Sequence, residues 1–241
     1  TLRSSTFDDL DRAEFIRTTL DPLYGRLLSI QLALEIELST EIGPSEIIVN
    51  PTARSMFATD VLYPSASSGI SRSSITPNHV ELGRKLFFDP ILSRDSTISC
   101  GSCHHTALYF TDGLAHSIGI DNQLTPRNAP SIINVAYQPY MFWDGGVPTI
   151  EQQVLAPISN PLEMDFDVNA VVARLNNHPA YPALFEKAYG QPPSVFTLTR
   201  AIANYERSLF SGTSQFDEFQ YYNKTDALSP SALNGKSIFF G

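Results

Sequence analysis

The sequence holds only two cysteines, three positions apart, and a histidine directly follows the second: Cys100-Gly-Ser-Cys103-His104. A disulfide over so short a span would stabilise little, because its entropic effect grows with the length of the loop that it closes. The pattern instead matches the attachment signature of c-type haem. Two thiols at this spacing can each add to one vinyl group of the same porphyrin, and the adjacent histidine becomes the proximal iron ligand. The motif therefore predicts one covalent haem c, attached through Cys100 and Cys103 and ligated by His104.

Two other kinds of site contain a similar cysteine pair. A thioredoxin-like redox dithiol would need a strand before the motif and a helix after it, whereas the surrounding sequence predicts helix and loop. A zinc site would need two further cysteine or histidine ligands, and the remaining histidines form no second close pair. These are His79, His105, His116 and His178. The motif is therefore interpreted as a haem site, with a redox dithiol and a zinc site as the alternatives.

From the motif to about residue 148, the sequence predicts mostly loop. Glycine and proline recur through this stretch, at Gly113, Gly119, Pro126, Pro130, Pro139, Gly145, Gly146 and Pro148. A segment with so little regular structure needs a partner that orders it. Haem is a candidate for that partner, because burying apolar surface contributes about 25 cal/mol per Å².

The chain before the motif is expected to form a helical extension and a linker over residues 1–75. Asp21 and Pro22 indicate a helix start, with Asp21 as the N-cap. Apolar residues then recur at helical spacing, at Leu23, Leu27, Ile30, Leu34 and Leu38. The alternation from residue 30 to residue 38 also fits a strand. Residues 43–79 predict loop, and the run SASSGISRSS at 65–74 resembles a linker.

Helical patterns dominate the remainder, so the predicted fold class is mostly α: a loop-rich, cytochrome c-like haem domain behind an N-terminal helical extension. The expected helices span residues 79–88, 149–156, 168–176, 179–189, 197–210 and 230–240.

Composition excludes several classes of protein. Hydrophobic residues make up 42% of the chain and charged residues 17%, which is typical of a folded globular protein. The net charge of −9 disfavours a nucleic-acid partner, since phosphates require a basic surface. The most apolar segment, Leu27–Leu38, is interrupted by Glu35 and Glu37, so no membrane span is predicted. The first residue is Thr rather than Met, as expected of a processed chain or of part of one.

The motifs around the cysteines resemble, in order and spacing, the bacterial di-haem cytochrome c peroxidase family, which includes the di-haem enzyme that matures tryptophan tryptophylquinone. They are ELGRKLFFDPILSRDSTISCGSCHH, YFTDGLAHSIG, RNAPSIINVAY, MFWDGG, IEQQVLAPISNPLEM and FDEF. The resemblance covers about residues 78–241 and places a haem peroxidase-like domain at 76–225. It implies an oxidoreductase that reduces hydrogen peroxide, or uses it to oxidise a partner.

The resemblance also implies roles for individual residues. Glu163 matches the distal catalytic acid/base and Gln153 a polar residue beside it. Trp143 matches a tryptophan between the two haems that serves electron transfer, and Asn128 a residue that helps to hold calcium. Three of them have a plainer alternative: a capping or surface carboxylate for Glu163, core packing for Trp143 and a turn-bracing amide for Asn128.

The sequence departs from the family pattern on the expected distal side of the haem. Classical members carry there a histidine that ligates the resting iron, whereas this chain has Ile120, which cannot bind iron. The distal side is therefore expected to be open to water or peroxide, as in the cofactor-maturing branch. His116 is the alternative ligand, although an exposed loop histidine is the commoner explanation.

No second haem motif occurs in the sequence. Residues 226–241 resemble the beginning of a second haem domain that is absent from this chain. Three explanations stay open: a fragment, a second haem on another chain, or a lineage with one haem. The expected partners are hydrogen peroxide and an electron-donor protein or second haem domain, with a homodimer as a further candidate. The expected location is the periplasm or another extracytoplasmic space, where haem c is attached. The alternative function is a non-catalytic electron-transfer cytochrome subunit.

Overall fold

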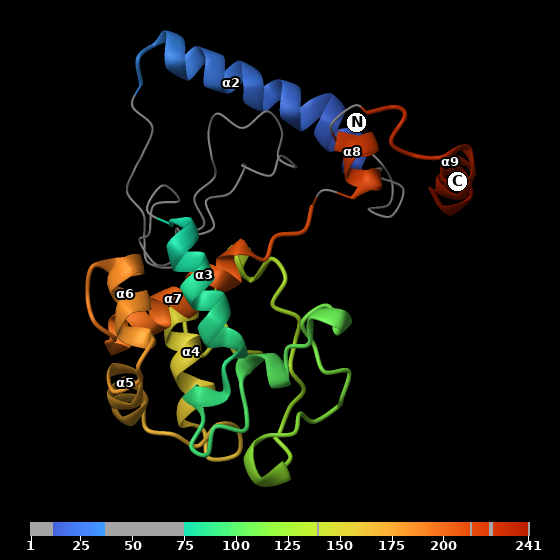
Figure 1. Ribbon diagram of the computed structural model, residues 1–241. Helices are drawn as coiled ribbons and strands as arrows, with labels where there is room; N and C mark the ends of the chain where they lie inside the picture. The colour runs from blue at the N-terminus through green and yellow to red at the C-terminus, as the bar shows by residue number, and fades with distance from the viewer. Residues whose placement is uncertain (1–11, 37–74, 139, 213, 222–223, 241) are drawn as a thin grey trace. The chain divides into compact units, whose positions relative to one another are not determined.

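The computed structural model describes residues 12–36, 75–138, 140–212, 214–221 and 224–240 (Figure 1). The chain divides into two compact units, of which one contains residues 64–210 with 42–47 and the other contains the remaining residues. The described residues contain α-helices and short 3₁₀ turns, and their only β-pairings are isolated bridges. The predicted mostly α fold is therefore confirmed. The predicted linker at 65–74 lies outside the described residues.

The N-terminal extension contains the helix α2 (Asp21–Ala33), so the strand alternative is wrong for these residues. Asp21 is the first residue of α2 rather than its N-cap, because the helical turns α1 (Arg12–Phe15) and η2 (Ile16–Leu20) run directly into it. The apolar stripe is exposed along α2 and its C-cap, at Leu23, Leu27, Ile30 and Leu34. Leu38, the last residue of the predicted stripe, lies outside the described residues.

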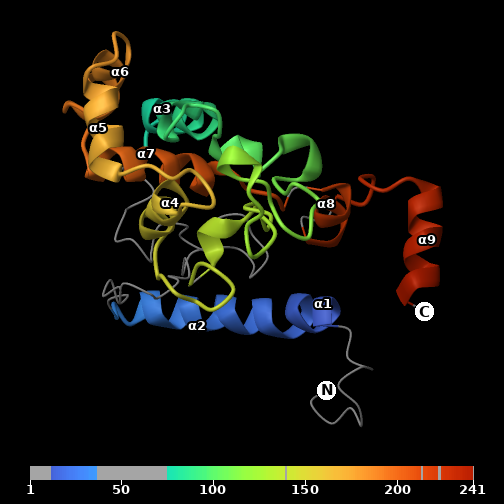
Figure 2. The ribbon, with the colours of Figure 1, turned by 90° about the horizontal axis from the view of Figure 1, so that it is seen from below.

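In the unit that carries the cysteine motif, the described residues form five helices. They are α3 (Pro77–Phe88), α4 (Ile150–Ser159), α5 (Val168–Asn176), α6 (Tyr181–Tyr189) and α7 (Val195–Ser208), and α5 and α6 lie side by side in Figure 1 and Figure 2. Their starts follow N-cap chemistry: the side chains of Thr76, Thr149, Asp167 and Ser194 accept hydrogen bonds from backbone N–H groups of α3, α4, α5 and α7. The helix α9 (Pro230–Phe240) also forms as expected, whereas α8 (Gln215–Tyr221) was not predicted.

The helix α7 forms the centre of this unit and packs against α3 and α4. Leu198, Ala201 and Ile202 of α7 are fully buried. The crossing with α3 depends on Gly83, where a Cβ atom would lie 1.9 Å from the carbonyl oxygen of Ala201. Only a residue without a side chain permits so close an approach of the two backbones.

Residues 89–148 contain short 3₁₀ turns in place of longer helices, as the glycine and proline pattern predicts (green in Figure 1). The turns are η5 (Pro90–Leu92), η6 (Cys100–Ser102), η7 (Thr106–Leu108), η8 (Ile120–Asn122) and η9 (Val135–Tyr137). Isolated bridges pair His105 with Thr111, Ile118 with Leu124 and Met141 with Val147. This segment supplies the cysteine motif and several other predicted site residues.

Charged side chains are buried where α4 meets α7. Nη2 of Arg207 donates to Oε2 of Glu151 at 2.8 Å, and the Arg207 side chain is only 1% exposed. The neighbouring Glu206 is also buried. Burial raises the pKa of Glu206 to about 8, with the charge of Arg207 opposing the rise and the charge of Glu151 adding to it. Glu206 is therefore largely protonated at neutral pH.

The close contact at Gly83 makes the α3–α7 crossing sensitive to one added methyl group. We expect Gly83→Ala to lower the free energy of unfolding by about 1–3 kcal/mol, since overpacking outweighs the roughly 1 kcal/mol that alanine gains over glycine in a helix. The midpoint of urea unfolding of the haem-loaded protein measures this change. Gly235→Ala in α9, where a Cβ meets nothing within 4 Å, is the control. An unchanged midpoint for Gly83→Ala would contradict the packing.

The raised pKa of Glu206 predicts a pH dependence of stability. Between about pH 5 and pH 8 the folded chain keeps a proton that the unfolded chain releases, so the free energy of unfolding falls as pH rises. This group contributes a slope of at most about 1.4 kcal/mol per pH unit. We expect Glu206→Gln to remove that contribution, whereas Glu186→Gln, at an exposed site on α6, keeps it. Urea unfolding at several pH values measures the slope of the free energy of unfolding against pH. Equal slopes in the parent and both variants would contradict the raised pKa of Glu206.

Candidate haem site

The cysteine motif folds into one tight turn. The amides of Cys103 and His104 both donate to the carbonyl oxygen of Cys100, at 3.2 and 2.9 Å. The turn begins at Ser99, whose amide donates to Oγ of Ser102 at 3.0 Å. Its middle residue is glycine because a Cβ at position 101 would lie 2.4 Å from the ring of Phe88. The turn therefore packs directly on the C-terminal end of α3.

His104 is held in the tautomer that a metal ligand requires. Its Nδ1–H donates to the carbonyl oxygen of Phe110 at 2.8 Å, which leaves Nε2 with a free lone pair. Burial lowers the pKa of His104, so the neutral imidazole is favoured. The carbonyl that receives this hydrogen bond belongs to a loop in which Tyr109 and Phe110 both adopt left-handed backbone angles, with φ of 55° and 61°. Such angles are costly for residues other than glycine and concentrate at functional sites.

The structure disfavours both alternatives to haem. Burial raises the pKa of Cys103 to about 11 and that of Cys100 further still, so neither thiol is activated as a redox dithiol requires. Among the residues that the structure describes, no group of three or more His, Cys, Asp or Glu side chains could hold a zinc ion. The chemistry of the motif, two protonated thiols beside one neutral imidazole with a free Nε2, fits haem c.

Exposed apolar side chains surround the motif in sequence. Residues 88–143 expose nine large ones: Phe88, Leu108, Tyr109, Leu114, Ile118, Leu124, Tyr140, Phe142 and Trp143. In the helical remainder of this unit, from 149 to 210, the exposed large hydrophobics are Phe196 and Phe210. A porphyrin is an apolar ligand, and its binding would remove such side chains from water. The segment therefore fits a haem as well as the motif does.

Glu163 lies in the loop between α4 and α5 and is half-buried. Nδ2 of Asn160 donates to its Oε1 at 2.7 Å, and its own amide donates to the Asn160 carbonyl at 3.0 Å. Burial raises the pKa of the Glu163 carboxyl. Its negative charge acts in turn on both thiols, raising the pKa of Cys100 and of Cys103. Sγ of Cys103 lies 3.8 Å from the carbonyl oxygen of Ile118, two residues before the Ile120 that pairs with Glu163, so the fold brings Glu163 toward a motif that is 60 residues away in sequence.

Ile120 lies against the backbone of Glu163. Its amide donates to the Glu163 carbonyl oxygen at 2.8 Å, and its side chain is fully buried. The preceding residue is glycine because a Cβ there would lie 1.9 Å from the carbonyl oxygen of Leu162. His116, the alternative ligand, is exposed, and its Nδ1 pairs with the carbonyl oxygen of Thr125 at 2.9 Å.

The other predicted site residues lie apart from these contacts. Gln153 is half-buried in the first half of α4, and Asn128 is exposed in a loop. Trp143 is 90% exposed, so the core-packing interpretation of this residue is wrong. A calcium ion at Asn128 and a distal role for Gln153 stay predictions.

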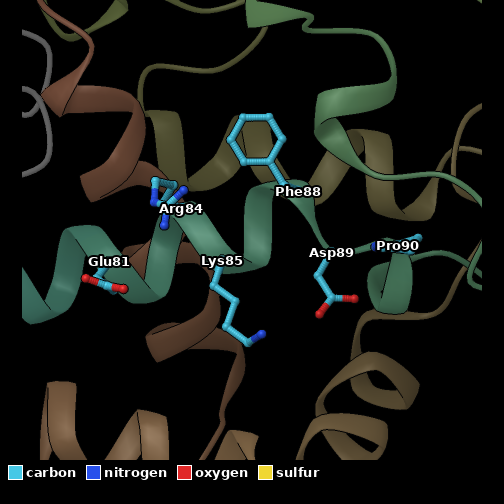
Figure 3. A pocket seen from close by; sticks show the side chains of 6 residues that line it. All are labelled: Glu81, Arg84, Lys85, Phe88, Asp89 and Pro90. Atoms are coloured by element: carbon cyan, nitrogen blue, oxygen red, sulfur yellow. The ribbon is translucent and has the colours of Figure 1, made fainter.

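Sequence reasoning missed residues that act through their backbone atoms and residues that contact partners far away in the sequence. Phe110 acts through its carbonyl oxygen, which leaves no side-chain signal. Arg94 pairs with Asp121 and Asp165, which are 27 and 71 residues away in sequence. The structure also has a pocket of about 560 Å³ along the end of α3, which no predicted site residue lines (Figure 3). Its lining residues are Glu81, Arg84, Lys85, Phe88, Asp89 and Pro90.

Comparisons with known proteins agree with these features. The family model of the di-haem cytochrome c peroxidases matches residues 77–226. The chain is 37% identical over 169 residues to the methylamine utilization protein MauG of Methylorubrum extorquens, covering 69% of this chain and 48% of that protein. It is 36% identical over 172 residues to the cytochrome c551 peroxidase of Nitrosomonas europaea, covering 70% of this chain and 51% of that one.

Solved structures show the same likeness. A MauG-like protein associated with microbial copper homeostasis matches with a TM-score of 0.60 and 33% identity, over 69% of this chain and 50% of that one. The chain spans about half the length of the curated relatives that it matches. Within the described residues, none of the helices has the length and apolar character needed to cross a bilayer. From the family match, the motif and the fold together, we conclude that the chain belongs to the di-haem cytochrome c peroxidase family.

Proposed function

We propose that residues 76–225 form the peroxide-reacting haem domain of a c-type haem peroxidase. Cys100 and Cys103 would attach the haem, and Nε2 of His104 would ligate its iron. Glu163 would act as the acid/base that moves the peroxide proton. Family membership supports haem peroxidase chemistry, and the roles of these four residues are our assignment.

One observation carries the proposal: the backbone of Glu163 pairs with Ile120, two residues from Ile118, whose carbonyl oxygen lies 3.8 Å from Sγ of Cys103. An acid/base catalyst works best when its pKa is near the working pH, and burial moves Glu163 in that direction. Nδ2 of Asn160 holds Oε1, which leaves Oε2 as the atom that would exchange the proton. The burial of its carboxyl distinguishes Glu163 from a fully exposed surface carboxylate.

The chemistry divides between the cofactor and the chain. When bound, haem supplies an iron that accepts a peroxide oxygen and delivers electrons to the O–O bond. Oε2 of Glu163 would take the proton from one peroxide oxygen and return it to the other, so that the departing oxygen leaves as water. Ile120 offers no ligating atom, so we propose that the distal side stays open to peroxide. Asn160 would keep the carboxyl in one orientation during both proton transfers.

Electrons must come from outside this domain. We propose that they arrive past Trp143, whose exposure leaves it available to a second haem domain or to a donor protein. Residues 226–241 would begin that second domain, and the reaction would take place in the periplasm or another extracytoplasmic space. Calcium at Asn128, a distal role for Gln153 and a homodimer belong to the same proposal, on the resemblance to the family.

Covalent attachment is the first test. We expect the double variant Cys100→Ala, Cys103→Ala to release its haem on acid–acetone extraction, because no thioether bond remains. The parent should keep haem in the protein fraction, as should a His116→Ala variant, which leaves the motif intact. Intact mass spectrometry counts the haems attached per chain. Covalent haem in the double variant would contradict the assignment of these cysteines.

The role of Glu163 is the second test. Glu163→Gln keeps the volume of the side chain but removes the exchangeable proton, so the rate of haem oxidation by peroxide should fall about 10²–10⁴-fold. Stopped-flow mixing with peroxide measures this rate and needs no electron donor. The visible spectrum before mixing should stay unchanged, because Glu163 is not an iron ligand in this proposal.

Glu186→Gln, at an exposed carboxylate of α6, is the matched control and should react at the parent rate. If Glu163→Gln reacts as fast as the parent, the catalytic proposal fails. The non-catalytic electron-transfer cytochrome would then be the better interpretation.

A further inference from the structure

The loop that carries Glu163 is joined to the loop that carries Ile120 by two backbone contacts. The Ile120 amide donates to the Glu163 carbonyl oxygen at 2.8 Å. Gly119 approaches Leu162 so closely that a Cβ would lie 1.9 Å from the Leu162 carbonyl oxygen. The position of the Glu163 backbone therefore depends on the position of residues 119–122.

Arg94 links both loops to a third segment. Its Nη2 donates to Oδ2 of Asp121 at 2.6 Å, and its Nη1 donates to Oδ2 of Asp165. Its own amide donates to the carbonyl oxygen of Met164 at 3.0 Å. Arg94 thus contacts both of the loops that meet in the Ile120–Glu163 pairing. The planar guanidinium presents two nitrogens in a fixed geometry, which suits it to bridge two carboxylates.

Arg94 is itself held in place from α5. Nη1 of Arg174 donates to the carbonyl oxygens of Ile91 and Ser93 at 2.8 and 2.6 Å, and its Nη2 donates to the carbonyl of Arg94 at 2.9 Å. The Arg174 guanidinium also lies 4.0 Å from the ring centroid of Phe166. The segment that presents Arg94 is therefore anchored to the helical part of the unit.

The two aspartates adopt a backbone conformation that few residues tolerate. The φ angles of Asp121 and Asp165 are 55° and 47°, in the left-handed region. Both residues direct a carboxylate at the same guanidinium from such a backbone. Left-handed residues other than glycine persist where surrounding contacts over-determine them, and the two ion pairs are such contacts. Asparagine also accepts left-handed angles, so Asp→Asn removes the charge without adding backbone strain.

The ion pairs are partly exposed, with the Arg94 side chain 44% accessible and those of Asp121 and Asp165 55% and 32%. Pairs of this kind each shift an equilibrium by about 1.4- to 5-fold. That is too little to build the loops but enough to bias them between positions. The backbone contacts hold the loops together, and the two ion pairs of Arg94 add to them.

We propose that Arg94 is a positioning residue, which acts through Asp121 and Asp165 to hold Glu163 in place for reaction with peroxide. The proposal rests on the catalytic role proposed for Glu163. Misplacing a catalytic group by about 1 Å is enough to reduce a rate by up to about 100-fold, so a weak bias on the loop has a measurable effect on the reaction.

Hydrogen exchange of the haem-loaded protein tests whether the ion pairs of Arg94 with Asp121 and Asp165 hold the loops, without measuring activity. Exchange at the Ile120 amide should be about 2- to 10-fold faster in Arg94→Gln than in the parent. Asp121→Asn and Asp165→Asn should give smaller increases, because each leaves one ion pair intact. Arg84→Gln on α3 removes an equal charge away from these ion pairs, so exchange at the Ile120 amide should match that of the parent. Parent-like exchange in Arg94→Gln overturns the proposal.

Peroxide kinetics test whether Arg94 acts through Glu163. Arg94→Gln should slow haem oxidation about 10-fold, and Arg94→Lys should fall between the parent and Arg94→Gln, because lysine keeps the charge but cannot bridge both carboxylates as a fork. The double variant Arg94→Gln, Glu163→Gln should be no slower than Glu163→Gln alone. Effects that multiply in the double variant would overturn the positioning role.

The two proposals fail in different ways. A parent-like rate in Glu163→Gln removes the proposed function, and the positioning role falls with it, whatever the exchange data show. A slow Glu163→Gln with a parent-like rate in Arg94→Gln keeps the proposed function and overturns the role of Arg94 alone. A slow Arg94→Gln with faster exchange and no further loss in the double variant supports both.

Discussion

The close crossing of α3 and α7 at Gly83 is the contact on which the rest of the unit depends. It sets the direction in which α3 presents Phe87 and Phe88 at its C-terminal end. The ring of Phe87 lies 5.2 Å from that of Tyr205 on α7 and 6.2 Å from that of His104, between centroids. Phe88 packs under the glycine of the cysteine turn. The haem-binding motif is thereby attached to the helical core through aromatic packing, although it contains no long helix itself.

His104 and Glu163, which we propose to lie on the proximal and distal sides of the haem, are oriented by different kinds of interaction. His104 is oriented by one hydrogen bond to a backbone carbonyl, which the left-handed loop at Tyr109 and Phe110 turns toward it. The backbone of Glu163 is joined to that of Ile120, and we propose that the ion pairs of Arg94 help to position it. The proximal arrangement is local in sequence, whereas the distal one joins segments far apart. In our proposal, substitutions on the distal side therefore change rates without removing haem.

Much of the fold could be predicted because its signals are local. Helical patterns in the sequence indicated the helices from α3 to α7, and glycine and proline indicated the loop-rich segment. The errors have local causes as well. Asp21 was read as an N-cap although helical turns precede it, and α8 was missed. The domain boundaries at 75/76 and 225/226 stay predictions. Trp143 shows the limit of residue type as a guide, since its 90% exposure contradicts core packing, the plainer alternative to the electron-transfer role.

The sequence by itself indicated c-type haem, because two thiols and an imidazole at fixed spacing need only one turn of backbone, and its ordered motifs indicated the family. It also determined the helical class through patterns that repeat within a few residues. Only the tertiary structure decided which carbonyl orients His104, that Ile120 lies on the backbone of Glu163, and that Arg94 joins two aspartates. Those contacts depend on loop paths that are set by packing. Residues distant in sequence carry no local pattern that predicts a contact between them.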